Sequence, residues 1–524
     1  MKLNLTLIIL LTSFLGFSQD YSFEWGEPTK TKTSILDIYS VNGKSFYAWT
    51  STKGGYSRIM SYKNLSYTST TYFRNVVNGK PSEYEGTFEI DGKIYIFTSE
   101  DNAEKTSKTL YVHAFKESAE KSDIEGKKIA SFDYDKKNKR RSGYKLIASE
   151  DKQKICATYY SSNRKKSDSK NGKYGYSVFD ANLSVESEGS FEDILEEKGE
   201  TIIDYKLSNQ GNLFMVTSFE VKGEPTTIKF YKVTGDEFNA LQFNLGEKYT
   251  NQLSVAVDKS ENFIVSGFYG ERGIKGQTRG TGVRGVFFAV MNPKNEEILS
   301  SGYNEFDDQF IMEGLTNRQK QRSEKKKEQK GIEPSLYNFK MRKFEATADG
   351  GFLGVAEEYF VVVTEIPNPR SSLNTQKVYT YYYNDLIVFK LDGEGKMQWK
   401  KKIQKLQITN NMYDTRVSFV MKQVNEKLFI IFNDNLKNYD PISKKFLESE
   451  IPRPNNYTKK NNAMAIVKMD LESGKIERNA INGKKEFGSI LLTKLCIPDP
   501  QNPTILVYTI KDSKEMVGRM NFND

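Results

Sequence analysis

The chain has little of the chemistry on which most enzymes depend. Its 524 residues include two cysteines, three tryptophans and one histidine, His113. So few Cys and His residues cannot assemble a zinc site of the usual Cys and His type. No serine lies in a GxSxG turn, and the GxxxxGK[ST] phosphate loop is absent. We therefore predict no catalytic residues, no metal site and no cofactor, and we expect His113 to pack inside a strand.

Cysteine is also too rare for a disulfide framework. Cys156 and Cys496 both lie in apolar stretches, KICATYY and TKLCIPD, far apart in sequence. Two buried thiols fit these contexts, because free cysteine behaves as a small hydrophobe. A bridge between them stays open at this point, since it would need the two strands to be neighbours.

Long apolar runs are missing except at the N-terminus. Lys2 precedes the run Leu3–Leu15, which is shorter than the ~20 residues that a membrane-spanning helix needs. Small residues at Gly16 and Ser18 fit a signal-peptidase site. We predict a signal peptide at residues 1–18, with an uncleaved anchor as the alternative. The mature chain is then exported to the periplasm or the cell exterior, with no transmembrane segment.

The most informative feature is a repeat of a polar turn, an apolar strand, a loop and a second apolar strand. The clearest copy is DGGFLGVAEEY at Asp349–Tyr359, followed by NDLIVFKLDGEGKMQW at Asn384–Trp399. We find eight imperfect copies between Asn42 and the C-terminus. A long, loose repeat of paired strands predicts an all-β propeller over residues 19–524, with eight four-stranded blades, or seven if two weak copies merge.

Two irregularities refine this architecture. The last copy ends at MVGRMNFND without an outer strand, so we expect Tyr21–Trp25 to complete the last blade and close the ring. The segment at about 306–340 carries MEGLTNRQKQRSEKKKEQKG, which is rich in Lys, Arg, Glu and Gln. That composition predicts a charged helical or disordered insertion.

Two loops are the candidate binding regions. Residues Gly267–Gly285 hold seven glycines and four cationic residues, whose side chains and backbone amides could hold an anion. The tyrosine run VYTYYYND begins at Val378 and could stack on a sugar or a peptide. A flexible hairpin loop and ordinary strand packing are the respective alternatives. The candidate binding residues are Arg272, Lys275, Arg279, Arg284, Tyr381, Tyr382 and Tyr383.

Paired carboxylates could serve a glycosidase, but their spacing here distinguishes none of them from surface acids. The candidates are Asp204, Asp307, Asp308, Glu357 and Glu358.

The formal net charge of +9 is mild for this length, and the basic loops form no known nucleic-acid module, so we expect no nucleic-acid partner.

The stretch DGGFLGVAEEY…DLIVFKLDGEGKMQWKKKI, within Asp349–Ile403, resembles the repeat of secreted β-propeller proteins common in Bacteroidota, whose blade pattern is related to PQQ-like and kelch-like propellers. The resemblance implies a propeller fold and export, and it implies no activity.

These observations predict a monomeric, non-catalytic binding or scaffold propeller of the cell envelope. Its loops on one face would recognise an envelope protein or a glycan, and the cationic loops fit an anionic partner. The alternative is a secreted carbohydrate-active hydrolase or lyase. That enzyme would need two or more carboxylates converging with aromatic side chains in the central funnel.

Overall fold

The computed structural model of the chain describes residues 20–523 except for short gaps. The gaps are 31–34, 42–44, 52–55, 103, 119, 135–141, 162–172, 193–199, 220–226, 235–236, 245–247, 251, 259, 272–281, 293–296, 369–370, 450–451, 456, 458–460, 483–489, 501 and 512–513. The predicted signal peptide, residues 1–18, lies outside the described residues.

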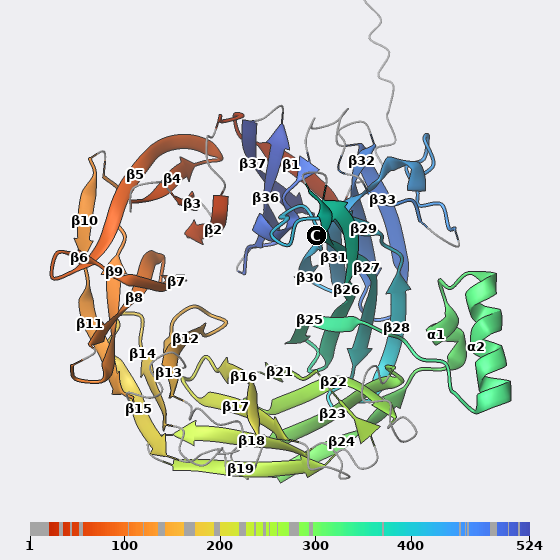
Figure 1. Cartoon of the computed structure of the whole chain (residues 1–524), viewed down its shortest axis with the longest axis horizontal. Coiled ribbons are helices and arrows are strands. Elements are labelled where there is room, and N and C mark those ends of the chain that lie inside the picture. Colours follow the sequence, from red (N-terminus) through yellow and green to blue (C-terminus); the bar gives the residue numbers. More distant parts are fainter. Residues whose placement is uncertain are drawn as a thin grey trace, which may run out of the picture.

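The described residues form eight sheets arranged in a ring, as Figure 1 shows, and their strands pair antiparallel except for the short β10, which is parallel to β5. Each sheet is one blade, and the all-β propeller predicted from the repeat is confirmed. Blade 1 contains β2 (Ile35–Val41), β3 (Ser45–Ser51), β4 (Ser57–Lys63) and β5 (Ser66–Val77), and blade 2 contains β7 (Glu83–Ile90), β8 (Lys93–Asn102), β9 (Ser107–Ala114) and β11 (Lys127–Asp133). Blade 3 contains β12 (Ser142–Ala148), β13 (Ile155–Ser161), β14 (Lys173–Phe179) and β15 (Val185–Glu192), and blade 4 contains β16 (Thr201–Leu207), β17 (Leu213–Phe219), β18 (Thr227–Thr234) and β19 (Glu237–Asn244).

Blades 5 to 8 complete the ring. Blade 5 contains β21 (Ser254–Val257), β22 (Phe263–Glu271), β23 (Gly285–Asn292) and β24 (Glu297–Glu305), and blade 6 contains β25 (Phe339–Ala346), β26 (Phe352–Asn368), β27 (Ser371–Leu391) and β28 (Met397–Ile403). Blade 7 contains β30 (Val420–Val424), β31 (Lys427–Asn435), β32 (Asn462–Asp470) and β33 (Ile476–Asn482). Blade 8 contains β34 (Ile490–Leu491), β35 (Ile497–Pro498), β36 (Thr504–Lys511), β37 (Lys514–Phe522) and β1 (Tyr21–Trp25). Short strands extend some blades: β6 (Lys80–Pro81), β10 (Ser122–Glu125), β20 (Lys248–Tyr249) and β29 (Gln407–Thr409).

The N-terminal strand closes the ring as predicted. β1 pairs antiparallel with β37, with Tyr21 opposite Phe522 and Trp25 opposite Gly518. The rings of Phe23 and Trp25 stack at 5.6 Å and pack on the core between blades 7 and 8. The pairing gives β37 a partner on both sides and makes β1 the outer strand of blade 8, so the two ends of the described chain meet in one blade.

Apolar side chains pack between adjacent blades because each sheet buries both of its faces. Between blades 5 and 6, for example, Phe268, Phe288 and Phe389 share one cluster. Cys156 and Cys496 are both free thiols buried in such clusters, so they are not paired.

His113 is fully buried, with Nε2 2.8 Å from Thr98 Oγ1 and Nδ1 2.8 Å from the Ile124 carbonyl oxygen. These contacts confirm a structural role for His113.

Helices occur in the predicted insertion between blades 5 and 6. Helix α1 covers Asp308–Met312 and helix α2 covers Asn317–Lys330. Thr316 and Gln319 form a capping box at the start of α2, and Gly331 ends it in the left-handed conformation. Two 3-10 turns, η2 (Leu436–Asn438) and η4 (Thr493–Leu495), lie in blades 7 and 8. No helix in the described part of the chain is long and apolar enough to cross a membrane.

Candidate functional site

The antiparallel strand order sorts the connections onto two faces of the disc. The turns from the first to the second strand of every blade lie on one face, which we call the turn face. The loops from the second to the third strand, and those between blades, lie on the other, which we call the loop face. The end of β22, the start of the α1–α2 insertion and the described part of the long β26–β27 hairpin therefore all lie at the loop face.

The innermost strands of neighbouring blades contact one another and line the central channel. On the turn face the channel opens into a cavity of about 710 Å³ whose lining includes Glu89, Glu150 and Glu345. Burial, together with the negative charge of nearby Glu150, raises the pKa of Glu345. No aromatic side chain lines this cavity in the described part of the chain.

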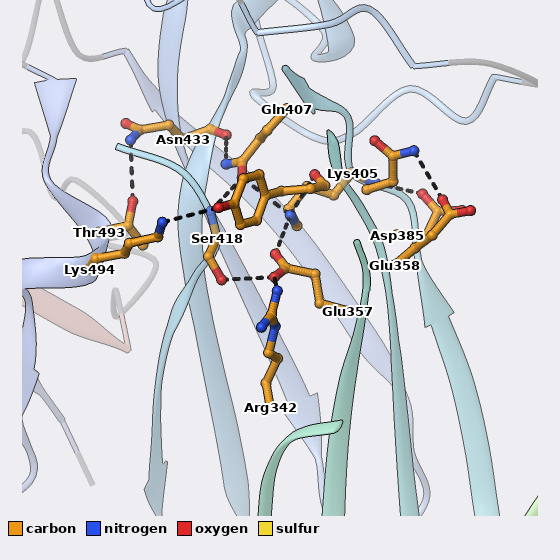
Figure 2. A network of polar contacts seen from close by, with 12 residues as sticks. Arg342, Glu357, Glu358, Asp385, Lys405, Gln407, Ser418, Asn433, Thr493 and Lys494 are labelled. Carbon is orange, nitrogen blue, oxygen red and sulfur yellow. Dashed lines mark hydrogen bonds and ion pairs between the residues drawn. The ribbon is translucent and has the colours of Figure 1, made fainter. Parts of the chain in front are cut away.

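A fully buried ion pair lies where blades 6 and 7 meet (Figure 2). Lys405 Nζ lies 2.8 Å from Glu357 Oε1, and neither side chain is exposed to solvent. Lys405 Nζ also donates to the Tyr383 carbonyl oxygen at 2.8 Å and to Gln407 Oε1 at 3.2 Å. Burial lowers the pKa of Lys405, although the Glu357 carboxylate opposes that shift.

The second carboxylate oxygen of Glu357 is also occupied. Arg342 on β25 donates to Glu357 Oε2 through Nε at 2.9 Å, and Ser418 Oγ donates to it at 3.1 Å. Arg342 reaches the central channel, where it lines a cavity of about 310 Å³ together with Asp204. Asp204 itself lies 3.5 Å from Lys145 Nζ. Glu357 is thus saturated with donors, which is the arrangement of a structural carboxylate.

Hydrogen bonds of buried side-chain amides extend this network to blade 8. Gln407 Nε2 donates to the Asn433 carbonyl oxygen at 2.8 Å. Asn433 Nδ2 in turn donates to the carbonyl oxygens of Arg416 and Leu491, at 2.8 and 2.7 Å. The network fixes the segment after β28 against β31 and η4, because each buried polar group needs its partner in place.

Glu358 points away from Glu357, as Figure 2 shows, and lies near Asp385. Asn384 Nδ2 donates to Glu358 Oε2 at 3.0 Å, and the backbone N–H of Lys405 donates to Asp385 Oδ1 at 2.9 Å. Burial raises the pKa of both carboxyls, and the charge of Asp385 raises that of Glu358 further. Adjacent Glu357 and Glu358 therefore do not act as a pair.

The tyrosine run splits between the two faces of the β26–β27 hairpin. Tyr381 and Tyr383 are buried in a cluster with Val417 and Tyr457, whereas the Tyr382 ring stacks on Phe360 at 4.6 Å. Lys494 Nζ lies 4.8 Å from the centre of the Tyr383 ring. Burial and the nearby Tyr359 and Glu357 raise the pKa of Tyr383 to about 12. Tyr381 and Tyr383 thus serve mainly as packing, the alternative left open by the sequence.

The glycine-rich loop and the α1–α2 insertion meet at their bases. Val283 and Leu336 form a β-bridge, with hydrogen bonds of 2.6 and 3.0 Å between their backbones. Arg284 is only 8% exposed. Its guanidinium binds Glu305 at 2.8 Å and Asp308 at 3.1 Å, and it also donates to the Pro334 carbonyl oxygen. Of the four cations predicted in this loop, Arg284 therefore holds the loop base in place. Arg272, Lys275 and Arg279 lie outside the described residues.

Helix α2 carries the largest concentration of exposed positive charge in this insertion. It holds seven lysines and arginines against Glu324 and Glu328, so its formal charge is 7 − 2 = +5. None of its side chains is buried, and Figure 1 shows it projecting from the rim of the ring. Lys327 binds Asp308 at 2.6 Å and Glu333 at 2.9 Å. Within the described residues, no ion pair occupies Arg318, Lys320, Arg322, Lys325, Lys326 or Lys330.

Sequence reasoning missed the Glu357–Lys405 pair and a second buried pair, Arg478 with Asp434. Neither pair has a local signature, since its members lie 48 and 44 residues apart. Asp307 was a candidate acid, but its side chain accepts the Phe310 N–H at 2.8 Å and caps α1.

No family model and no curated protein matches the chain. Among solved structures, the WD40 domain of SCAP from fission yeast is similar at 10% identity, covering 96% of this chain and 99% of that one, with a TM-score of 0.39. A protein of unknown function from Bacteroides caccae is similar at 8% identity over 71% and 94%, with a TM-score of 0.27. The β-propeller domain of the Trilobed protease from Pyrococcus furiosus is similar at 11% identity over 71% and 98%, with a TM-score of 0.27. Likenesses this distant carry no argument about function, and the propeller assignment rests on the sheets themselves.

Proposed function

We propose that the protein is an exported, non-catalytic binding propeller that recognises an anionic envelope glycan or protein through its loop face. The observation that carries the proposal is the exposed cationic helix α2, in the connection between blades 5 and 6, beside the base of the glycine-rich loop of blade 5. The base of the glycine-rich loop and the α1–α2 insertion contact each other at Val283 and Leu336. Helix α2 then presents exposed cations to solvent.

Electrostatics favours this use of the surface. A helix that is polar on every face gains no stability from packing an apolar stripe, so α2 contributes little to the core. Its like charges repel one another, which an anionic partner would relieve. Because the side chains are exposed, we expect the attraction to weaken steeply as salt shortens the screening length.

The test compares two variants with the same change of charge. The first replaces Arg318, Arg322, Lys325 and Lys326 by Gln. The matched control replaces four exposed lysines of blades 1 and 2, Lys80, Lys93, Lys127 and Lys128, by Gln. Both proteins and the wild type are run on immobilised polygalacturonate in a salt gradient, with neutral dextran as the blank. We expect the α2 variant to elute at much lower salt than the control.

Equal elution of the two variants would show that only the net charge matters and would reject the proposed face. Release of reducing ends from the polymer by the wild type would reject a non-catalytic role. Export is tested separately by mass spectrometry of the native N-terminus: a chain that begins at Gln19 supports it, and an intact Met1 contradicts it.

A further inference from the structure

A two-stranded arm projects from blade 6 beyond the rest of its sheet. The arm consists of Phe360–Pro367 of β26 and Thr375–Tyr382 of β27, which pair in regular register from Val361↔Tyr381 to Pro367↔Thr375. β25 covers β26 only as far as Glu358. Within the described residues, no strand pairs with β26 beyond that point on the edge that faces β25.

The outward-facing backbone groups of the arm can be identified. The Tyr359 N–H donates to the Asn338 carbonyl oxygen at 2.9 Å, on the side of β25. Since backbone direction alternates along a strand, the N–H groups of Val361, Val363 and Glu365 point to the same open edge. Pro367 is the next residue in this alternation, and its backbone nitrogen carries no hydrogen. Proline is tolerated in strands where its nitrogen faces an open edge, which agrees with this assignment.

Several apolar side chains of the arm are exposed. Val361, Val362 and Val363 are 37%, 42% and 50% exposed, and Ile366 and Tyr379 are 39% and 46% exposed. Natural edge strands are usually shortened, charged or covered, because an open apolar edge invites pairing with another chain. Only Glu365 and Lys377, 3.9 Å apart, put charge on the described part of the arm.

We propose that the open edge of β26 binds an extended segment of a partner protein, which adds to the arm as a further strand. The edge offers main-chain hydrogen bonds, and Val361 and Val363 offer apolar contacts to alternate side chains of the added strand. At the base of the arm, Lys340 is exposed and lies 4.6 Å from the centre of the Tyr359 ring. The segment should therefore carry β-branched residues with an acidic residue at the end nearest Lys340.

Two other occupants fit the arm less well. A lipid layer would cover the valines but would leave the edge N–H and C=O groups without partners, which is costly in hydrocarbon. A second copy of the arm offers Glu365 as its only carboxylate in the described part, and Lys377 already pairs with that residue. A partner segment with its own acidic end satisfies both the edge and Lys340.

The test uses a synthetic ten-residue peptide of alternating valine and threonine, with glutamate at one end and lysine at the other. A second peptide has the same sequence but is N-methylated on the alternate amides that would face β26. The variant Val363→Pro removes one outward N–H, whereas Val363→Ala shortens the same side chain and keeps that N–H. Thermal unfolding first establishes that both variants keep the wild-type fold.

We expect the unmodified peptide to bind the wild type and to slow hydrogen exchange at Val361, Val363 and Glu365. Val363→Pro should weaken binding about tenfold, because it removes one hydrogen bond and blocks its neighbours. Val363→Ala should weaken binding less. Equal binding of the N-methylated peptide, or no binding at millimolar concentration, would overturn the proposal. So would a wild-type dimer in sedimentation that Val363→Pro dissociates, because a second copy would then occupy the edge.

This inference concerns a surface separate from helix α2. The four α2 substitutions should leave peptide binding unchanged, and Val363→Pro should leave elution from polygalacturonate unchanged. Failure of either proposal can therefore be told apart from failure of the other.

Discussion

The Glu357–Lys405 pair and helix α2 place the same kinds of charged side chain in opposite surroundings. Glu357 and Lys405 are fully buried, and the pair is surrounded by donors and acceptors. Most α2 cations are exposed, and most lack an ion-pair partner within the described residues. Buried charges need every partner in place and so fix a geometry, whereas exposed charges leave their electrostatic attraction available to another molecule. Burial, and not charge, separates the structural groups here from the candidate binding groups.

The largest expected effect is on the buried side of this comparison. Glu357→Gln leaves the Lys405 ammonium buried without a carboxylate, so we expect a loss of about 3–5 kcal/mol in the free energy of unfolding. The matched control, Glu365→Gln, breaks the exposed pair with Lys377 in the same hairpin and should cost less than about 0.5 kcal/mol. Urea unfolding measures both. Similar losses for the two variants would erase the distinction between buried and exposed pairs.

Closure of the ring gives the next effect. Phe23 is half-buried on β1 and stacks on Trp25. Phe23→Ala should lower the free energy of unfolding by about 1–3 kcal/mol, through lost packing between blades 7 and 8. Ser22→Ala, an exposed position on the same strand, is the control and should change little. If Phe23→Ala is as stable as the control in urea, β1 does not contribute to closing the ring.

Much of the fold could be predicted because the repeat is local. Each turn and its apolar strand are adjacent in sequence, and the unfinished last copy made the role of Tyr21–Trp25 predictable. The charged insertion was visible from composition alone. The buried pairs could not be predicted, because Glu357 meets Lys405 only after two blades pack together.

The surroundings of the candidate site residues also depend on contacts between residues that are distant in sequence. Arg284 looked like its neighbours in the glycine-rich loop, yet its guanidinium is held by Glu305 and Asp308. Tyr381 and Tyr383 were candidates for stacking on a ligand, but their side chains are buried in a cluster with Val417 and Tyr457. Which side of a strand faces solvent depends on the loops that fold over it, and that information is not local.

A smaller effect concerns pH. Burial raises the pKa of Asp385 above its value in the unfolded chain, so its charged form costs the folded state stability at neutral pH. That cost disappears once pH falls below the unfolded pKa. Asp385→Asn keeps an oxygen for the Lys405 N–H and has no charge at any pH. The stability of Asp385→Asn relative to wild type should therefore be higher at pH 7 than at pH 3.5, as measured by urea unfolding. The opposite order would show that the surrounding lysines favour the carboxylate.

The smallest expected effect is on the stability of the α2 variant. Replacing Arg318, Arg322, Lys325 and Lys326 by Gln should change the free energy of unfolding by no more than about 0.5 kcal/mol, since the side chains are exposed. Calorimetry checks this directly. A marked loss would mean that the helix charges support the fold, which would move α2 to the structural side of the comparison.

The most direct test of the account is to locate a bound anion on the disc. Hydrogen exchange is measured along the whole chain with and without a galacturonate decamer. We predict slower exchange in Asp308–Lys330 and in the segment leading to Gly285, all on the loop face. Slower exchange confined to the turn face, around Asp91, Asp151 and Asp258, would contradict the account.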